Sequence, residues 1–188
     1  MNKRLFIATK IKLETKTYQT IYQIQRTLAK EKIKWVELSN IHLTLKFLGD
    51  TDTEIIPKII EKLEKIALSF SPTLLQMHSI GIFPHLKRPR VLWIGLDDNQ
   101  KIVELANIID DYMIDLGFEA EKREFKPHIT IGRIKFLKNI RLMKDIINQY
   151  KDIIFQQVPI QEFILYESIL RPQGPMYKAI AKFKLLKT

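Results

Sequence analysis

The chain has 188 residues, of which 46% are hydrophobic and 28% charged, and this is enough to bury a substantial core in one domain or in two small lobes. It contains no cysteine, which excludes a disulfide framework, a thiolate nucleophile and cysteine-ligated metal centres, and fits a reducing cytoplasm. The net charge of +10, from 31 Lys and Arg against 21 Asp and Glu, would attract RNA, although the basic residues are spread along the chain and a solvated basic surface explains them equally well.

The first half of the chain alternates between two hydrophobic periods. In chain order they predict a strand at 4–13, a helix at 17–31, a strand at 42–49, a helix at 53–68 with Pro57 in its first turn, and a strand at 73–83. None of these segments approaches the length of apolar sequence that spans a bilayer, and the N-terminal region lacks the continuous apolar segment of a signal peptide. We therefore expect a cytoplasmic protein with no membrane partner.

The second half repeats this order. It predicts a strand at 90–96, a helix at 99–116 that ends before Gly117, a strand at 126–136, a helix at 139–150, and strands at 161–170 and 177–186. The succession of strand, helix, strand, helix and strand therefore occurs twice.

The stretch NIHLTLKFLGD at 40–50 places two polar side chains within an apolar strand. Side chains alternate between the faces of a strand, so His42 and Thr44 point one way while Leu43 and Leu45 point the other. One such pattern arises easily by chance.

A second copy of the pattern changes this interpretation. His-x-Thr-x, with apolar x, occurs at 42–45 and again at 128–131, an offset of 86 residues. The same offset aligns Leu5 with Val91, each in the strand that precedes the motif by a helix. Two copies in register indicate function, with one imidazole and one hydroxyl from each half.

These motifs and their flanks carry a resemblance. Together with RLFIA, RPRVLWIGL, FKPHITIGR and RPQGPMYKAI, they resemble the two-histidine (2H) phosphoesterase superfamily, in particular its LigT-like RNA 2′,3′-cyclic phosphodiesterase branch, over almost the whole chain. The resemblance implies one α+β domain spanning 1–188, with two pseudo-symmetric lobes whose antiparallel sheets face each other across a central cleft with helices outside. It also implies that both motifs line this cleft.

The chemistry of such an enzyme suits these residues. Opening a cyclic phosphodiester requires a base and an acid, and histidine can serve as either near neutral pH. The resemblance assigns His42 as proton donor and His128 as proton acceptor. The hydroxyls of Thr44 and Thr130 can donate hydrogen bonds to the phosphate, and the resemblance adds Arg133 as a further phosphate-binding residue. We expect no metal and no other cofactor, because neither histidine lies in a metal-ligand spacing.

The position of Arg133 poses a geometric problem. Five residues after His128, a regular strand would direct the guanidinium to the opposite face, so a bulge or a strand end is required near Gly132. In the first half the equivalent residue is Phe47.

The loop before the strand at 90–96 is a second polar candidate. Phe83, His85, Arg88 and Arg90 could stack on a base and bind an RNA backbone, or could simply belong to a solvated basic loop. His78, in the strand at 73–83, is interpreted as structural.

We therefore expect a monomeric hydrolase that converts a 2′,3′-cyclic phosphate at the end of an RNA or oligonucleotide to a 2′-phosphate. The resemblance adds ATP-independent 2′-5′ RNA ligation as the reverse reaction. An ATP-dependent ligase is disfavoured, because the sequence has neither a GxxxxGK[ST] loop nor a KxDG motif. The alternative is a non-catalytic RNA-binding or nucleotide-binding protein that retains the cleft.

Overall fold

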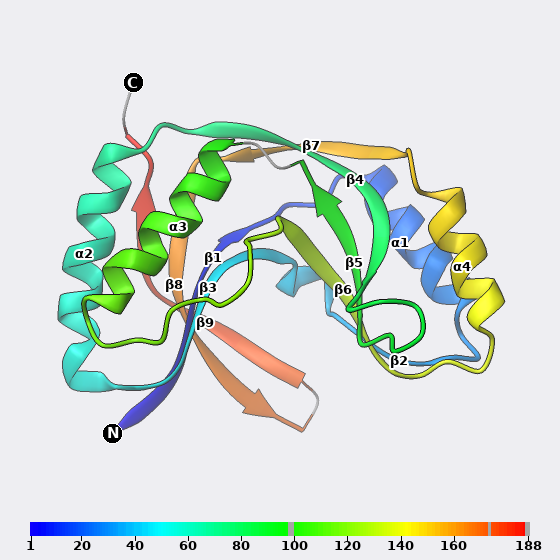
Figure 1. The fold of residues 1–188 in the computed structure, drawn as a ribbon, viewed down its shortest axis with the longest axis horizontal. Helices are drawn as coiled ribbons and strands as arrows, with labels where there is room; N and C mark the ends of the chain where they lie inside the picture. Colours follow the sequence, from blue (N-terminus) through cyan, green and yellow to red (C-terminus); the bar gives the residue numbers. More distant parts are fainter. Residues whose placement is uncertain (98–99, 173, 187–188) are drawn as a thin grey trace.

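The computed structural model describes residues 1–97, 100–172 and 174–186 (Figure 1). Its helices are α1 (Thr15–Thr27), α2 (Ile56–Ser69), α3 (Gln100–Ile114) and α4 (Ile140–Gln149). Its strands are β1 (Asn2–Lys10), β2 (Lys32–Trp35), β3 (His42–Asp52), β4 (Thr73–Phe83), β5 (Val91–Leu96), β6 (His128–Phe136), β7 (Ile154–Ile160), β8 (Glu162–Arg171) and β9 (Gly174–Lys184).

The strands of this described part form one antiparallel sheet. Their order is β7-β4-β5-β6-β3-β1-β8-β9, and β2 pairs with the second half of β6, beyond the point where β6 pairs with β3. The α+β class expected from the sequence is confirmed. The two sheets that we expected are halves of one sheet, because β3 and β6 pair at Leu43 and Ile129.

The helices lie at the two ends of the molecule, with the strands between them. Figure 1 shows α2 beside α3 at one end and α1 beside α4 at the other. Pro57 is in the first turn of α2, where its missing N–H removes no helical hydrogen bond. No helix in the described ranges is long and apolar enough to cross a membrane.

Strand β1 is buried on both of its faces, because its alternate residues belong to different clusters. Leu5 and Ile7 lie in the main core, whereas a second cluster consists of Phe6, Ala8, Ile164 and Tyr166, with Tyr177 packed against it. Ala8 pairs with Thr44, and direct partners project from the same face. This small cluster therefore supports the face that carries the first motif.

The sequence predicted most elements to within a few residues but missed two strands. The predicted strand at 73–83 matches β4. The predicted helix at 99–116 corresponds to α3, Gln100–Ile114, and residue 99 lies outside the described residues. The missed strands are β2, which has only four residues, and β7, whose sequence IFQQVPI contains a proline. Short length and proline both weaken a strand pattern.

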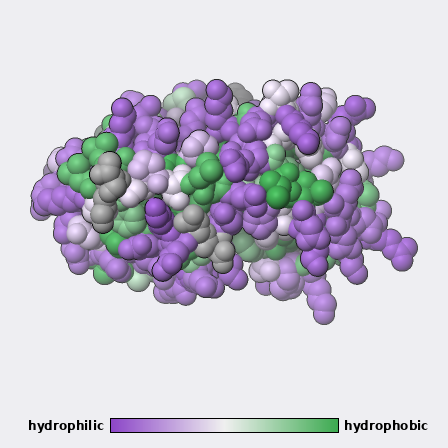
Figure 2. Space-filling view, turned by 90° about the horizontal axis from the view of Figure 1, so that it is seen from above, coloured by the Kyte–Doolittle hydropathy of each residue, from purple (hydrophilic) through white to green (hydrophobic). Residues whose placement is uncertain are grey.

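The surface is predominantly polar on the side seen from above. Figure 2 shows hydrophobic residues there as separate small groups among hydrophilic ones. This distribution is typical of a water-exposed surface.

Candidate active site

The two motifs meet where the halves of the sheet join. Leu43 of β3 pairs with Ile129 of β6 in antiparallel register, and both are buried. Continuing this register places the histidine of each motif next to the threonine of the other motif. The four polar side chains therefore surround one point in an arrangement with approximate two-fold symmetry.

Both motif histidines are held through the same ring nitrogen. His42 Nδ1 lies 2.7 Å from the carbonyl oxygen of Asn40, and His128 Nδ1 lies 2.6 Å from that of Lys126. A carbonyl oxygen can only accept, so each Nδ1 carries a hydrogen and donates it. The opposite nitrogen, Nε2, is therefore the atom that can gain or lose a proton.

The surroundings of both imidazoles favour their neutral forms. Burial lowers the pKa of His42, and nearby Arg133 and His128 lower it further, although the hydrogen bond to the Asn40 carbonyl opposes them. Burial also lowers the pKa of His128, against the opposing hydrogen bond to the Lys126 carbonyl. The pair is therefore less readily protonated than free histidine is.

A cavity of about 420 Å³ contains both motifs. It is lined by His42, Thr44, His128, Thr130 and Arg133, together with residues that include Arg4, Phe6, Lys34, Trp35, Glu37, Asn40, Phe47, Leu170 and Tyr177. The structure thus brings together in one cavity the five residues that the sequence suggested for acid–base chemistry and phosphate binding.

A bulge at the last residue of each motif turns one further side chain of the strand towards this cavity. In β6, Thr130 pairs with Trp93 and Gly132 with Leu92, so Ile131 has no partner in β5. This extra residue brings Arg133 to the motif face, as its predicted site required. In β3, Leu45 is the extra residue in the same way.

The bulge in β3 has two consequences. Phe47 is 64% exposed and lines the cavity. Lys46 is directed into the interior, where its Nζ binds the carboxylate of Asp110 and donates to the carbonyl oxygen of Glu119, 2.9 Å away. The ammonium is therefore buried with its hydrogen-bond partners.

The loop predicted to bind RNA lies at the margin of the site. The ring of Phe83 packs edge-on against His128, with centroids 4.9 Å apart. His85, Arg88 and Arg90 do not line the cavity; they form a turn closed by the hydrogen bond from Arg90 N to the Phe83 carbonyl. Phe83 thus supports His128, and an RNA-binding role of the other three stays a prediction.

His78 lies outside the cavity, in agreement with its structural interpretation. Its Nδ1 is 2.9 Å from Ser79 Oγ, and its backbone pairs with Gly95 of β5.

Sequence reasoning missed the aromatic support of His42. Tyr177 contacts the imidazole edge-on at a centroid distance of 5.2 Å, and Phe6 lies on another side at 5.2 Å. The side-chain amide of Asn40 donates to the carbonyl of Pro175, 3.2 Å away, and so ties the segment before β3 to β9. A lone aromatic residue in a predicted strand carries no local signal for this role, because the contact joins segments far apart in sequence.

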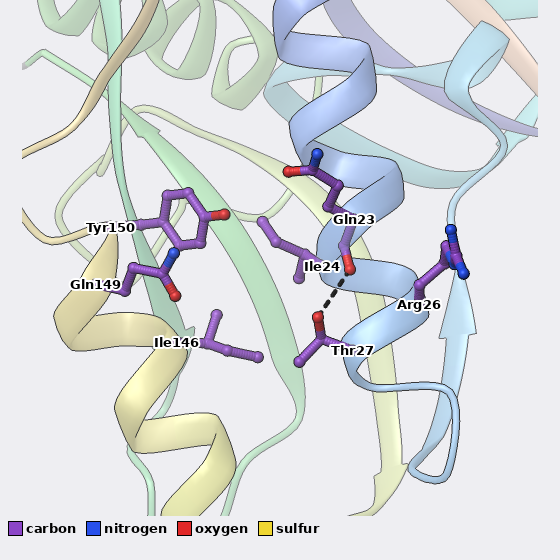
Figure 3. Close-up of a pocket in the computed structure, with 7 residues that line it drawn as sticks. All are labelled: Gln23, Ile24, Arg26, Thr27, Ile146, Gln149 and Tyr150. Atoms are coloured by element: carbon purple, nitrogen blue, oxygen red, sulfur yellow. Dashed lines mark hydrogen bonds between the residues drawn. The ribbon is translucent and has the colours of Figure 1, made fainter.

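A larger cavity of about 520 Å³ lies between α1 and α4. Figure 3 shows that its lining comes from these two helices and from the residue that follows α4; the lining residues are Gln23, Ile24, Arg26, Thr27, Ile146, Gln149 and Tyr150. It contains none of the predicted site residues. Size alone therefore does not identify the functional site, and the convergence of titratable side chains favours the smaller cavity.

Comparison with known proteins gives matches over almost the whole chain. A family model described as LigT like Phosphoesterase matches residues 11–93 and 94–177. An RNA 2′,3′-cyclic phosphodiesterase of Methanocaldococcus jannaschii is 39% identical over 96% of this chain and 99% of its own. One of Aquifex aeolicus with the same name is 32% identical over 90% of this chain and 93% of its own.

Solved structures share the fold. A crystal structure of a protein from Thermus thermophilus has a TM-score of 0.78 and 26% identity, covering 97% of both chains. E. coli LigT complexed with 3′-AMP also has a TM-score of 0.78, with 23% identity and complete coverage of both chains.

Proposed function

Because the chain belongs to the LigT-like phosphoesterase family, we propose that it is an RNA 2′,3′-cyclic phosphodiesterase, a hydrolase that converts a terminal cyclic phosphate to a 2′-phosphate. The observation that carries this proposal is the pairing of Leu43 with Ile129. It brings two imidazoles and two hydroxyls from distant parts of the chain to one cavity.

The geometry supplies a role for each residue. His128 Nε2 accepts a proton from water as the water oxygen attacks phosphorus. The bond from phosphorus to the ribose 3′ oxygen breaks, and His42 Nε2 donates a proton to that oxygen. Thr44, Thr130 and Arg133 bind the non-bridging oxygens as their charge increases. All groups in this scheme come from the chain itself, and we propose that it acts without a metal ion.

The same arrangement supports two further proposals. If a 5′ hydroxyl takes the place of water, its oxygen attacks phosphorus, the bond to the ribose 3′ oxygen breaks, and the product is a 2′-5′ phosphodiester, which is ATP-independent 2′-5′ ligation. We also propose a cytoplasmic monomer, because both motifs line a single cavity within one chain and a cysteine-free composition fits a reducing compartment.

The pH dependence of kcat/KM should reflect the lowered pKa values of both histidines. The reaction needs one protonated and one neutral imidazole, so its rate falls tenfold per pH unit above the higher apparent pKa. Burial lowers the pKa of each histidine from its ordinary value of 6.5. We therefore expect a bell whose descending limb has its midpoint below pH 6.5. A descending limb centred above pH 7, measured with a cyclic mononucleotide, would contradict this account.

The two threonine hydroxyls should contribute less than the histidines. Thr44→Val and Thr130→Val keep the branched shape but remove a hydrogen bond to a charged group, worth about 1.5–3 kcal/mol. We expect kcat/KM to fall about 10- to 150-fold. Thr20→Val, on α1 and outside the cavity, is the matched control and should behave like the unmodified protein. Unchanged kinetics in both motif variants would mean that the hydroxyls do not bind the phosphate.

Turnover distinguishes the enzyme from the alternative. A non-catalytic RNA-binding or nucleotide-binding protein would bind a 2′,3′-cyclic nucleotide without consuming it. Incubation with 2′,3′-cyclic AMP, followed by chromatography, should show hydrolysis in proportion to enzyme concentration. Stoichiometric binding with no product would support the alternative.

A further inference from the structure

Strands β2 and β6 carry an exposed row of side chains that leads away from the cavity. Their register pairs Lys34 with Arg133 and Lys32 with Phe136. Direct partners share a face, and so do residues two apart on one strand. These four residues, here called the β2–β6 strip, therefore lie on one face of the sheet.

A second bulge in β6 places Phe136 in this strip. Three residues after Arg133, a regular strand would direct the ring to the opposite face. The register shifts between Lys32 and Ile33, however, and adds one residue to β6. The side chain of Phe136 is consequently 57% exposed. Core packing does not explain this position, because exposing an aromatic ring forgoes its burial.

The strip is continuous with the active site. Lys34 and Arg133 line the cavity, and Lys32 and Phe136 continue the same face outwards along the neighbouring strands β2 and β6 (Figure 1). Alternate residues of a strand are about 6.6 Å apart. A chain whose end lies at the two histidines could therefore contact several members of the strip.

The acidic groups near the strip leave it positively charged. The carboxylate of Glu31 accepts hydrogen bonds from the backbone N–H groups of Lys138 and Asn139 at the start of α4. Glu37 lines the cavity beyond the other end of β2. The strip itself has three cations and no anion.

We propose that the β2–β6 strip binds the nucleotides that precede the cyclic end of an RNA strand. Phe136 stacks on a base, and Lys32 and Lys34 contact backbone phosphates, because single-stranded nucleic acids are bound by aromatic rings set among cations. This inference rests on the proposed function and extends it, in that the preferred substrate is an oligonucleotide and not a mononucleotide.

Two substrates test the strip separately from the chemistry. One is 2′,3′-cyclic AMP, and the other is a hexanucleotide that ends in a 2′,3′-cyclic phosphate. Phe136→Ala should lower kcat/KM for the hexanucleotide about tenfold and leave that for cyclic AMP within about twofold. Phe136→Trp, which keeps a stacking ring, should retain most of the activity, whereas Phe136→Leu should not. Tyr22→Ala, which removes another exposed aromatic ring, is the control.

The salt dependence of the reaction tests the proposed contact between Lys32 and an RNA phosphate. Lys32→Ala should weaken the dependence of log kcat/KM on log salt concentration for the hexanucleotide by about 0.7, the slope expected for one phosphate contact of a single strand. Lys30→Ala makes the same charge change outside the strip and should leave the slope unchanged. Equal losses on both substrates, or no loss on either, would overturn the inference.

A different result would show that the proposed function is wrong: the unmodified protein would turn over neither substrate. Anisotropy of a labelled hexanucleotide with a 2′-phosphate end would then still test the strip. Weaker binding by Phe136→Ala than by Tyr22→Ala supports it, and equal binding overturns it.

Discussion

Replacing His42 or His128 with alanine should lower kcat by at least about 100-fold, because each replacement removes a general acid or a general base. Both imidazoles are only partly buried and line the cavity, so alanine removes the proton-transfer group without opening a void in the main core. The rate of 2′,3′-cyclic AMP hydrolysis measures the effect, and circular dichroism checks the fold.

His78→Ala provides a matched control for this experiment. His78 is on β4 and outside the cavity, so the folded variant should retain activity within about threefold of the unmodified enzyme. Activity close to that of the unmodified enzyme in a folded His42→Ala or His128→Ala variant would reject the two-histidine mechanism.

A substrate whose leaving group needs no proton should restore a large part of the activity of one variant only. On a 4-nitrophenyl phosphodiester the phenolate leaves unprotonated, so loss of the general acid costs little while loss of the general base still costs about 100-fold or more. With His42 as proton donor, His42→Ala should approach the rate of the unmodified enzyme on this substrate, and His128→Ala should remain slow. Release of nitrophenolate measures both rates.

The electrostatics of the cavity disfavour the protonated form of His42 that this assignment requires. The pKa of His42 is lowered by burial and by nearby Arg133, although a proton donor must be protonated when it acts. A bound phosphate carries negative charge between the two histidines and favours protonation of a neighbouring imidazole. Recovery by His128→Ala instead of His42→Ala would show that the two roles are reversed.

The motif residues could be predicted from sequence because their signal is local and repeated. His42 and Thr44 share a strand face by alternation alone, and the second motif repeats the pattern. Arg133 could be placed only conditionally. Its position depends on the bulge at Ile131, and no residue type unambiguously marks a bulge of this kind.

The alignment of the two halves shows where sequence spacing fails. The offset of 86 residues aligned Leu5 with Val91. In the structure Phe6 pairs with Phe47, and Val91 pairs with Arg133, so Phe6 is the counterpart of Val91. The connections between these strands differ by one residue in length, and a run of apolar residues does not reveal such a shift.

The rest of the cavity depends on contacts between distant segments. Tyr177 reaches His42 from β9, and Lys34 reaches the cavity from β2, the strand that sequence analysis did not detect. Neither has a local pattern that distinguishes it from an ordinary strand residue. Such residues become visible only when the pairing of the strands is known.

The central claim is that the paired histidines open a cyclic phosphate without a metal. The most direct test is incubation of an oligoribonucleotide ending in a 2′,3′-cyclic phosphate with the enzyme in excess EDTA, followed by chromatography against standards with 2′-phosphate and 3′-phosphate ends. The account predicts complete conversion to the 2′-phosphate in EDTA. A cyclic end left intact in EDTA but cleaved when a divalent ion is restored, or a product with a 3′-phosphate, would contradict it.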